Sequence, residues 1–357
     1  MPPLTLAEPQ GQGLYRVHSA YTDDPLDELP EASAVCAMIA DLAQAASEAQ
    51  GQNAGIGFHC GAFTISGRLV ALTGAHRAGK STLVSRLTAE PDLRVFCDDV
   101  LALSKDGTGS ALGIAPRLRL PLPDSVTDAF REHVGASLGP ADDRYGYVLS
   151  PNLARHGATA PLCAIVMLDR RAGQRAGFHQ MPPEEALRLL VEQSITAYDD
   201  AGDAYATARR IVSGVAVLRL VYQDLEDAVC LLRQAFGGET ILPEDLPVGA
   251  PLADEPGAVP EPAPAPVAVE TVWRRAAGIG LRHVGQSAFL WWPGDGMLWQ
   301  LNPTGHAIWT LLELPGSARD IAAALAEIFP AVPPDRLEAD CAMLMARLAA
   351  EGFILTA

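Results

Sequence analysis

The hydrophobic pattern divides the chain into two structured stretches on either side of a proline-rich segment. In the first stretch, short apolar runs alternate with segments in which apolar residues recur every three or four positions, as expected of strands and amphipathic helices. The predicted strands are 67–74, 94–103, 161–168 and 214–221, and the predicted helices are 31–49, 80–90, 183–196 and 224–236. This alternation predicts an α/β domain.

The proline-rich segment, Gly249–Glu270, has neither a helical nor a strand period. Proline alternates there with alanine, glutamate and valine, a composition that favours extended polyproline II at ~3.1 Å per residue. We therefore expect a linker of up to roughly 60 Å at that rise. The predicted organisation is a domain over residues 1–248, a linker over 249–270 and a second domain over 271–357.

The second stretch is short and changes from strands to helices. Strands are predicted at 281–284, 288–292 and 297–301, followed by helices near 304–314, 317–328 and 334–351. In the last helix one apolar face is formed by residues at helical spacing: Leu337, Cys341, Leu344 and Leu348. We expect a small α+β domain of winged-helix type.

The composition and the net charge exclude some classes of binding partner. The chain has 357 residues, 49% of them hydrophobic and 19% charged, which is a globular balance. Its net charge of −17 argues against a nucleic-acid partner, since phosphate backbones attract positive surfaces. No apolar run reaches the ~18 residues that cross a bilayer, and the first residues lack a signal-peptide pattern. We expect a cytoplasmic protein without a membrane partner.

One segment carries the pattern G-x-x-x-x-G-K-[ST] of a phosphate-binding loop, between a predicted strand and a predicted helix. Backbone N–H groups and the helix start would hold phosphates, Lys80 would reach the terminal phosphates, and Ser81 would ligate Mg²⁺. Only Lys80 and Lys105 are lysines among the 26 basic residues, so lysine at this position is informative. The expected ligands are ATP and Mg²⁺, held by Gly74, Ala75, His76, Arg77, Ala78, Gly79, Lys80, Ser81 and Thr82.

An acidic pair and a histidine flank this loop. Asp98 and Asp99 come 18 and 19 positions after Lys80, within the apolar run predicted as a strand. Adjacent side chains on a strand point to opposite faces, so one carboxylate would serve Mg²⁺ and the other a different group. His59 precedes the loop; a single histidine is more often structural than catalytic. Buried acids need partners, which favours a site over a solvated strand end.

The order of His59, the loop 74–82 and Asp98-Asp99 resembles the catalytic core of HPr kinase/phosphorylase. This resemblance implies a PEP-carboxykinase-like P-loop fold that transfers the γ-phosphoryl group of ATP to a serine. It further implies that Lys80 binds phosphates, Ser81 and Asp99 hold magnesium, Asp98 is the base and His59 lies beside them; the two aspartate roles are exchangeable. The sequence departs from this family at His76-Arg77 and lacks its later Glu-Arg-Gly signature, so HPr itself is not the expected substrate.

The C-terminal stretch resembles PqqD-like domains. The resemblance rests on Leu301-Asn302-Pro303-Thr304-Gly305, on the apolar positions of the helices that follow, and on Glu351-Gly352-Phe353-Ile354. It implies a recognition domain that binds the leader of a ribosomally made precursor peptide as an added strand. The expected groove residues are Met297, Leu298, Trp299, Gln300, Leu301, Leu337, Cys341 and Leu344. The alternative is that these aromatic and apolar residues only fill a small core.

Together these features predict a kinase that phosphorylates a serine or threonine of a precursor peptide captured by its C-terminal domain. Other peptide-modifying enzymes and a second copy of the chain are further candidate partners. One alternative is a metabolite kinase whose small domain regulates it. Another is a non-catalytic protein in which nucleotide binding gates peptide delivery.

Overall fold

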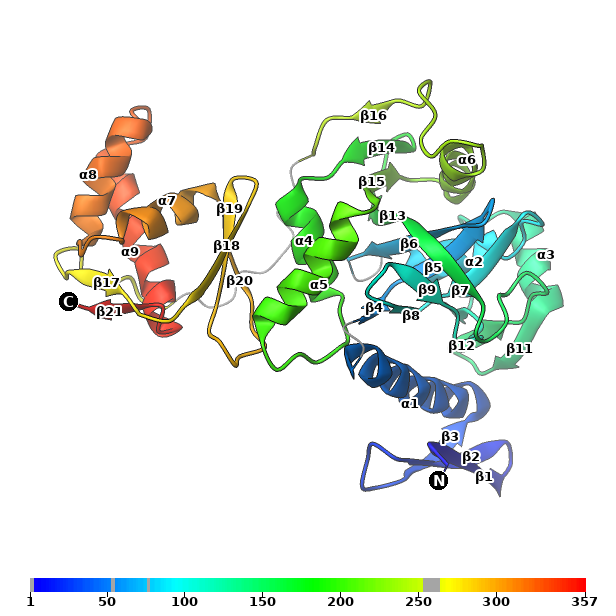
Figure 1. Cartoon of the computed structure of the whole chain (residues 1–357). Coiled ribbons are helices and arrows are strands. Elements are labelled where there is room, and N and C mark those ends of the chain that lie inside the picture. Colours follow the sequence, from blue (N-terminus) through cyan, green and yellow to red (C-terminus); the bar gives the residue numbers. More distant parts are fainter. Residues whose placement is uncertain (1–2, 53–54, 76–77, 253–263) are drawn as a thin grey trace. The chain divides into compact units, whose positions relative to one another are not determined.

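The computed structural model describes residues 3–52, 55–75, 78–252 and 264–357 (Figure 1). The chain forms two compact units. The larger comprises Met1–Met181, Glu185–Ala197 and Ala206–Leu252, and the smaller comprises Pro182–Glu184, Tyr198–Tyr205 and the C-terminal residues from Ala253 on. Within the described ranges, no helix has both the length and the apolar character needed to cross a bilayer.

The larger unit is built on a mixed sheet in which ten strands are described. Three parallel strands form its centre, with β13 (Thr159–Arg170) between β6 (Arg68–Gly74) and β15 (Ala216–Tyr222). Shorter strands extend the sheet on both sides: β5 (Gly61–Ile65) and β7 (Leu93–Cys97) beyond β6, and β14 (Gly177–Gln180) and β16 (Val248–Gly249) beyond β15. The carboxyl ends of the parallel strands share one edge, where α/β sheets usually bind ligands.

Helices cover both faces of this sheet, and the alternation along β13 shows how. Val166 and Leu168 of β13 belong to the main core, which also holds residues of α2 (Lys80–Leu87) and α6 (Leu225–Phe236). The intervening Met167 packs on the opposite face against buried residues of α4 (Pro183–Glu192) and Val212 of α5 (Ala201–Ser213). The α/β prediction is therefore confirmed, although α5 was not predicted.

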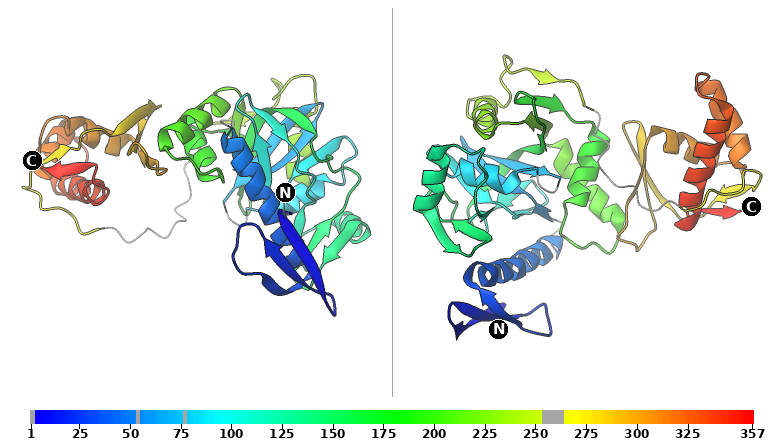
Figure 2. Two further views of the ribbon diagram at one scale, coloured as in Figure 1. Left: turned by 60° about the horizontal axis from the view of Figure 1, so that its bottom comes forward. Right: turned by 180° about the vertical axis from the view of Figure 1, so that it is seen from behind.

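Two further parts of the larger unit were not predicted from the sequence. The N-terminal residues form a three-stranded sheet of β1 (Thr5–Gly11), β2 (Leu14–Ser19) and β3 (Leu26–Pro30) against α1 (Glu31–Gln52), as both views of Figure 2 show. A second small sheet contains β10 (Arg117–Arg119), β11 (Leu138–Ala141) and β12 (Tyr145–Val148), with α3 (Asp128–Ser137) before β11.

The expected strand 94–103 is wrong: the chain bends at Asp98-Asp99 and forms two strands. β7 pairs with β5, whereas β8 (Val100–Leu103) pairs with β4 (Ile56–His59) and with β9 (Thr108–Ser110). β4 and β5 are themselves interrupted at Cys60, whose N–H donates to the Asp99 carbonyl at 3.1 Å. Both chain segments, 56–65 and 93–103, change pairing partners at the same place. The two carboxylates therefore lie in a bend rather than on opposite faces of a strand.

The smaller unit has the predicted order of strands followed by three helices. Its antiparallel sheet contains β18 (Gly280–Val284), β19 (Ser287–Trp291) and β20 (Trp299–Leu301), and its helices are α7 (Pro303–Leu311), α8 (Ala318–Ile328) and α9 (Pro334–Ala350). β17 (Trp273–Arg275) and β21 (Ile354–Thr356) form an additional pair. The third strand begins at Trp299 rather than Met297, because the Asp295 side chain accepts from the Met297 N–H and holds a turn there.

The described part of the proline-rich segment is not a free spacer along its whole length. Val248 and Gly249 pair with β14 in the larger unit, and Val267 and Val269 pack against the core of the smaller unit. The Val267 N–H also donates to the carbonyl of Ala342 at 3.3 Å. Residues 253–263, in the middle of the predicted linker, lie outside the described residues.

Candidate nucleotide and catalytic site

The phosphate-loop motif lies where the sequence predicted it, between the end of β6 and the start of α2. Its two motif glycines are required by the backbone. Gly79 has φ 89°, and a Cβ there would lie 2.8 Å from the Tyr222 hydroxyl. A Cβ at Gly74 would lie 2.8 Å from the carbonyl oxygen of Leu168 on β13. His76 and Arg77 fall outside the described residues.

Among the described residues, no side chain accepts hydrogen bonds from the first turn of α2. Gly79 is the residue that precedes the helix, and it offers no capping side chain. The first N–H groups of a helix lack partners within the helix and carry the positive end of its dipole. Together with Lys80 and Ser81, which lie in this same turn, they have the donors and the positive charge that suit a polyanion.

Tyr222, at the end of β15, fixes the loop from the neighbouring strand. Its hydroxyl donates to the carbonyl of Ala78 at 2.8 Å. Burial raises the pKa of Tyr222 to about 12, so the hydroxyl keeps its proton at neutral pH. The sequence motif did not indicate this contact, because the two residues are far apart in the chain.

Lys80, His59 and Asp99 converge on the open side of the loop. The Lys80 Nζ lies 3.0 Å from the Nε2 of His59 and 3.8 Å from Oδ1 of Asp99. The same Nε2 is 3.1 Å from Asp99 Oδ1, and Nδ1 of His59 is 3.1 Å from Gln193 Oε1. Nε2 can donate to Asp99 in the tautomer that carries a proton on this nitrogen, and it can accept from Lys80 in the other tautomer. His59 is therefore part of the site and couples its positive and negative groups.

The two neighbouring aspartates have opposite electrostatic properties. Asp98 is 5% exposed, and burial raises the pKa of its carboxyl; Lys80 opposes this shift and Asp99 adds to it. The Asp99 side chain is 56% exposed, and the hydrogen bond from His59 lowers its pKa, with Lys80 acting in the same direction. At neutral pH Asp99 is thus a firmly charged group, whereas Asp98 is the stronger proton acceptor.

Asp98 is also the point at which a distant strand joins the site. Its Oδ2 accepts from the backbone N–H of Arg117 at 3.2 Å, while its Oδ1 is buried with no hydrogen-bond partner among the described residues. The guanidinium of Arg117 lies 4.8 Å from the ring centroid of Tyr145 and contacts the sulfur of Cys36. Arg117 lies on β10, which pairs with β12, the strand that carries Tyr145.

These residues fit a magnesium-bound nucleotide. An uncapped helix start, an ammonium group and a hydroxyl match the oxygens of a triphosphate, and the orphaned Asp98 Oδ1 is a buried acceptor for a donor or cation. In the described part of the chain, no cluster of three or more His, Cys, Asp or Glu residues forms a metal site by itself. Mg²⁺ typically uses one or two protein ligands together with phosphate oxygens, which agrees with this donor set.

The structure separates the expected peptide-groove residues into two groups. Leu301, Leu337 and Cys341 are buried in the core of the smaller unit, as the alternative interpretation expected. Met297 is exposed, whereas Leu298, Trp299, Gln300 and Leu344 are partly exposed. Within the described residues β20 pairs only with β19, so its other edge presents unpaired backbone groups.

The comparisons bear mainly on this smaller unit. Residues 288–354 match the family model of coenzyme PQQ synthesis protein D (PqqD). The structure of TbiB1 in complex with the TbiA(beta) leader peptide is 21% identical, with a TM-score of 0.21, and the match covers 23% of this chain and 93% of that one.

A second structural neighbour is the Hpr(Ser) kinase/phosphatase from Coxiella burnetii. It is 14% identical with a TM-score of 0.27, and the match covers 50% of this chain and 90% of that one. No curated protein sequence matches the chain. The family match places a PqqD domain at the C-terminal end of this protein.

Proposed function

We propose that the larger unit transfers the γ-phosphoryl group of ATP to a serine or threonine hydroxyl of a precursor peptide, and that the PqqD domain captures this peptide. One observation carries the proposal. At the uncapped start of α2, Lys80 lies within 3.0 Å of His59, and the bend that holds Asp98 and Asp99 faces the same turn. A phosphate cradle beside a carboxylate pair is the arrangement that phosphoryl transfer to an alcohol requires.

The reaction has one bond-forming and one bond-breaking event. The hydroxyl oxygen of the peptide attacks the γ-phosphorus, the bond from that phosphorus to the bridging oxygen breaks, and the nucleoside diphosphate leaves. The hydroxyl proton moves to a carboxylate. Lys80 and the first N–H groups of α2 stabilise the charge on the transferred group and on the leaving diphosphate.

The different environments of the two aspartates suggest different tasks. Burial raises the pKa of Asp98, which suits the group that receives the proton. Asp99 stays ionised between His59 and Lys80, and with Ser81 it would hold magnesium. Bound magnesium would neutralise phosphate charge. The proximity of the Ser81 hydroxyl to Asp98, where it lowers the pKa of that carboxyl, favours the exchanged assignment as the alternative.

The PqqD domain supplies the acceptor. TbiB1 is described with a leader peptide, and the present domain has a free strand edge at β20 beside the partly exposed Leu344 of α9. An extended leader can add to this edge through backbone hydrogen bonds, with side chains giving selectivity. Binding the leader on the same chain raises the local concentration of the acceptor segment at the kinase site.

The test combines the full chain and Mg-ATP with a peptide encoded next to its gene and follows the peptide by mass spectrometry. We expect the gain of one phosphoryl group, lost in Lys80→Ala. Lys105→Ala is the matched control, because Lys105 is the other lysine and is exposed. Transfer to a small molecule with no labelled peptide would instead identify a metabolite kinase. Nucleotide binding without turnover would identify a nucleotide-gated delivery protein.

A further inference from the structure

A cavity of about 130 Å³ lies directly beside the phosphate loop. Gly79 and Thr82, at the start of α2, form one wall, and Tyr222 to Leu225, at the end of β15 and the start of α6, form another. The segment that precedes α3, including Ser125 and Val126, completes it. The cavity is thus continuous with the phosphate site and shares its residues.

The size of the cavity matches a planar heterocycle. A water-sized group needs roughly 10–15 Å³ of such volume, so the cavity holds about ten of them. The purine base adenine has ten non-hydrogen atoms. Phosphate or a single ordered ion would leave most of the cavity unfilled.

The chemistry of the walls also suits an aromatic ring. Val126, Leu225 and Pro123 supply apolar surface, and Ser125 and Gln223 supply polar groups at the same cavity. Arg170, whose guanidinium can stack on a planar ring, also lines it. The Asp224 carboxylate caps the start of α6 by accepting from the N–H groups of Glu226 and Asp227, at 2.8 and 3.1 Å. This helix start is therefore not available to an anion, and its carboxylate repels one. Apolar walls with a few polar groups are typical of nucleobase and other small-molecule pockets.

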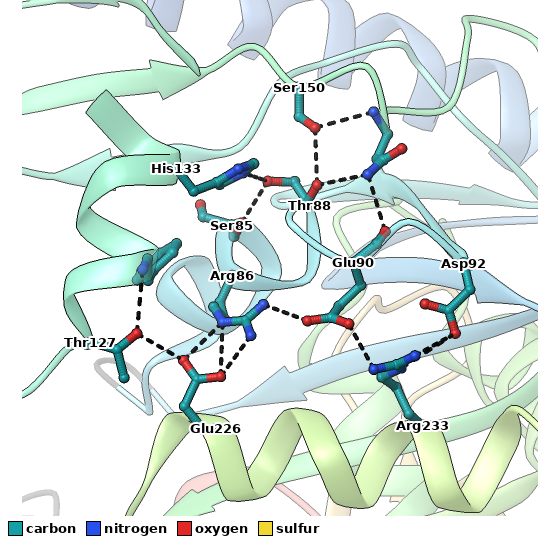
Figure 3. Close-up of polar contacts among 12 residues, drawn as sticks. Ser85, Arg86, Thr88, Glu90, Asp92, Thr127, His133, Ser150, Glu226 and Arg233 are labelled. Atoms are coloured by element: carbon teal, nitrogen blue, oxygen red, sulfur yellow. Dashed lines mark hydrogen bonds and ion pairs between the residues drawn. The ribbon is translucent and has the colours of Figure 1, made fainter. Parts of the chain in front are cut away.

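A cluster of hydrogen bonds that we call the clamp joins the last turn of α2 to Glu226 and Thr127, next to two lining segments of the cavity; Figure 3 shows these contacts. Arg86 donates from Nε to Glu226 Oε1 at 2.9 Å and from Nη2 to Oε2 at 2.7 Å. Thr127, which caps α3, donates to the same Oε1 at 3.3 Å. Glu226 follows Leu225 and Thr127 follows Val126, so these bonds hold both lining segments to the helix that begins at the phosphate loop.

We infer that this cavity binds the base of the nucleotide whose phosphates occupy the loop, so that it sets nucleotide selectivity. The inference rests on the proposed function for the phosphate site. It assigns Ser125 and the 223–225 segment to base recognition and gives the Arg86–Glu226–Thr127 clamp a positioning role.

The test compares two probes by titration calorimetry on the full chain: Mg-ATP and Mg-tripolyphosphate, which has the phosphates without the nucleoside. We expect ATP to bind roughly ten- to hundredfold more tightly, the range expected for burying one ring. Ser125→Trp should fill the cavity from an exposed position and remove this advantage while leaving tripolyphosphate binding unchanged. Ala136→Trp, exposed on α3 and not among the lining residues, is the control and should retain it.

A separate variant tests the positioning role of the clamp. Glu226→Gln should weaken ATP binding severalfold with tripolyphosphate binding unchanged, because only the base pocket loses its bracing. Equal affinity of the unmodified protein for both probes, or an undiminished ATP advantage in Ser125→Trp, would overturn the base assignment and leave the phosphate site intact. Failure of both probes to bind would overturn the phosphate site itself and the inference with it.

Discussion

Two helices, one in each unit, differ in how the backbone N–H groups of their first turn find hydrogen-bond acceptors. α8 is closed by its own side chains: Ser317 and Asp320 form a reciprocal capping box, with the Ser317 N–H donating to Asp320 at 2.9 Å. α2 begins after a glycine and has no side-chain cap. Unpaired N–H groups at a helix start are costly to leave without an acceptor, and this supports the proposal that the start of α2 binds a ligand's oxygens.

The contrast extends to the residues around each helix start. Near α2, the buried Asp98 Oδ1 has no hydrogen-bond partner within the geometric limits among the described residues. At the start of α8, Ser317 and Asp320 satisfy each other, and the helix contributes Ile321 and Leu325 to the core of the PqqD domain. The start of α8 is thus satisfied within the chain, whereas the start of α2 is proposed to be satisfied by a ligand. The predictions below remove one side of this contrast at a time.

The largest effect is expected from the acidic pair. Asp98→Asn should lower peptide phosphorylation by roughly 10²–10⁴-fold, since it removes the group that receives the proton, and ATP binding should persist. Asp99→Asn should instead raise the Mg²⁺ concentration needed for half-maximal rate. Both variants are measured by initial rates at several Mg²⁺ concentrations. If Asp98→Asn shifts the Mg²⁺ requirement and Asp99→Asn abolishes the rate at saturating Mg²⁺, the two roles are exchanged.

The open helix start can be disturbed directly at Gly79. In Gly79→Ala a methyl group would lie 2.8 Å from the Tyr222 hydroxyl, and a non-glycine residue would have to adopt φ 89°. We expect ATP to bind at least about tenfold more weakly, because left-handed backbone costs an L-residue roughly 1–2 kcal/mol before any collision. Calorimetry on the full chain measures this change.

A second substitution separates collision from strain. In Gly79→Ala/Tyr222→Phe the colliding oxygen is gone, and the next tyrosine atom is an ordinary 4.0 Å away. We expect partial recovery of ATP affinity relative to Gly79→Ala. Tyr222→Phe alone serves as the reference, since it also removes the hydrogen bond to Ala78. The absence of any recovery would show that backbone strain accounts for the whole loss.

How far the sequence could predict this site depends on how far apart its residues are. The loop and its strand–helix context are local, so the motif predicted them. The bend at Asp98-Asp99 was missed, because the apolar residues on both sides of it have the pattern of one continuous strand. The change of pairing partners at Cys60 arises only when the sheet assembles. Tyr222, Gln193 and the clamp through Glu226 come from distant elements and carry no motif, so only the fold could bring them to the loop.

A substitution in the PqqD domain should have an intermediate effect, limited to the KM for the peptide. Leu344→Glu places a charge at a partly exposed position of α9 and should raise the KM for the peptide by about tenfold, with kcat unchanged, if an apolar leader side chain packs there. Ala350→Glu, at an exposed position of the same helix, is the control. Equal KM values for the two variants would place the leader elsewhere on the domain.

The smallest effect concerns the closed helix start. Ser317→Ala removes the α8 cap and should lower the free energy of unfolding of the smaller unit by about 1 kcal/mol, while ATP binding stays unchanged. All five tryptophans lie between Trp273 and Trp309, so tryptophan fluorescence during urea unfolding reports on this unit. Thr304→Ala, exposed in the first turn of α7 and not its cap, is the control and should unfold as the unmodified protein does.

The pH dependence of this difference tests its cause. The Ser317 side chain and backbone lower the pKa of Asp320 in the folded state. A carboxyl with a depressed folded pKa contributes stability that is present above its unfolded pKa and is lost as pH falls through the folded value. The difference between Ser317→Ala and the unmodified protein should therefore be full at neutral pH and shrink in acid. A difference that is constant across this range would show that the Ser317 hydroxyl stabilises α8 without the charge of Asp320.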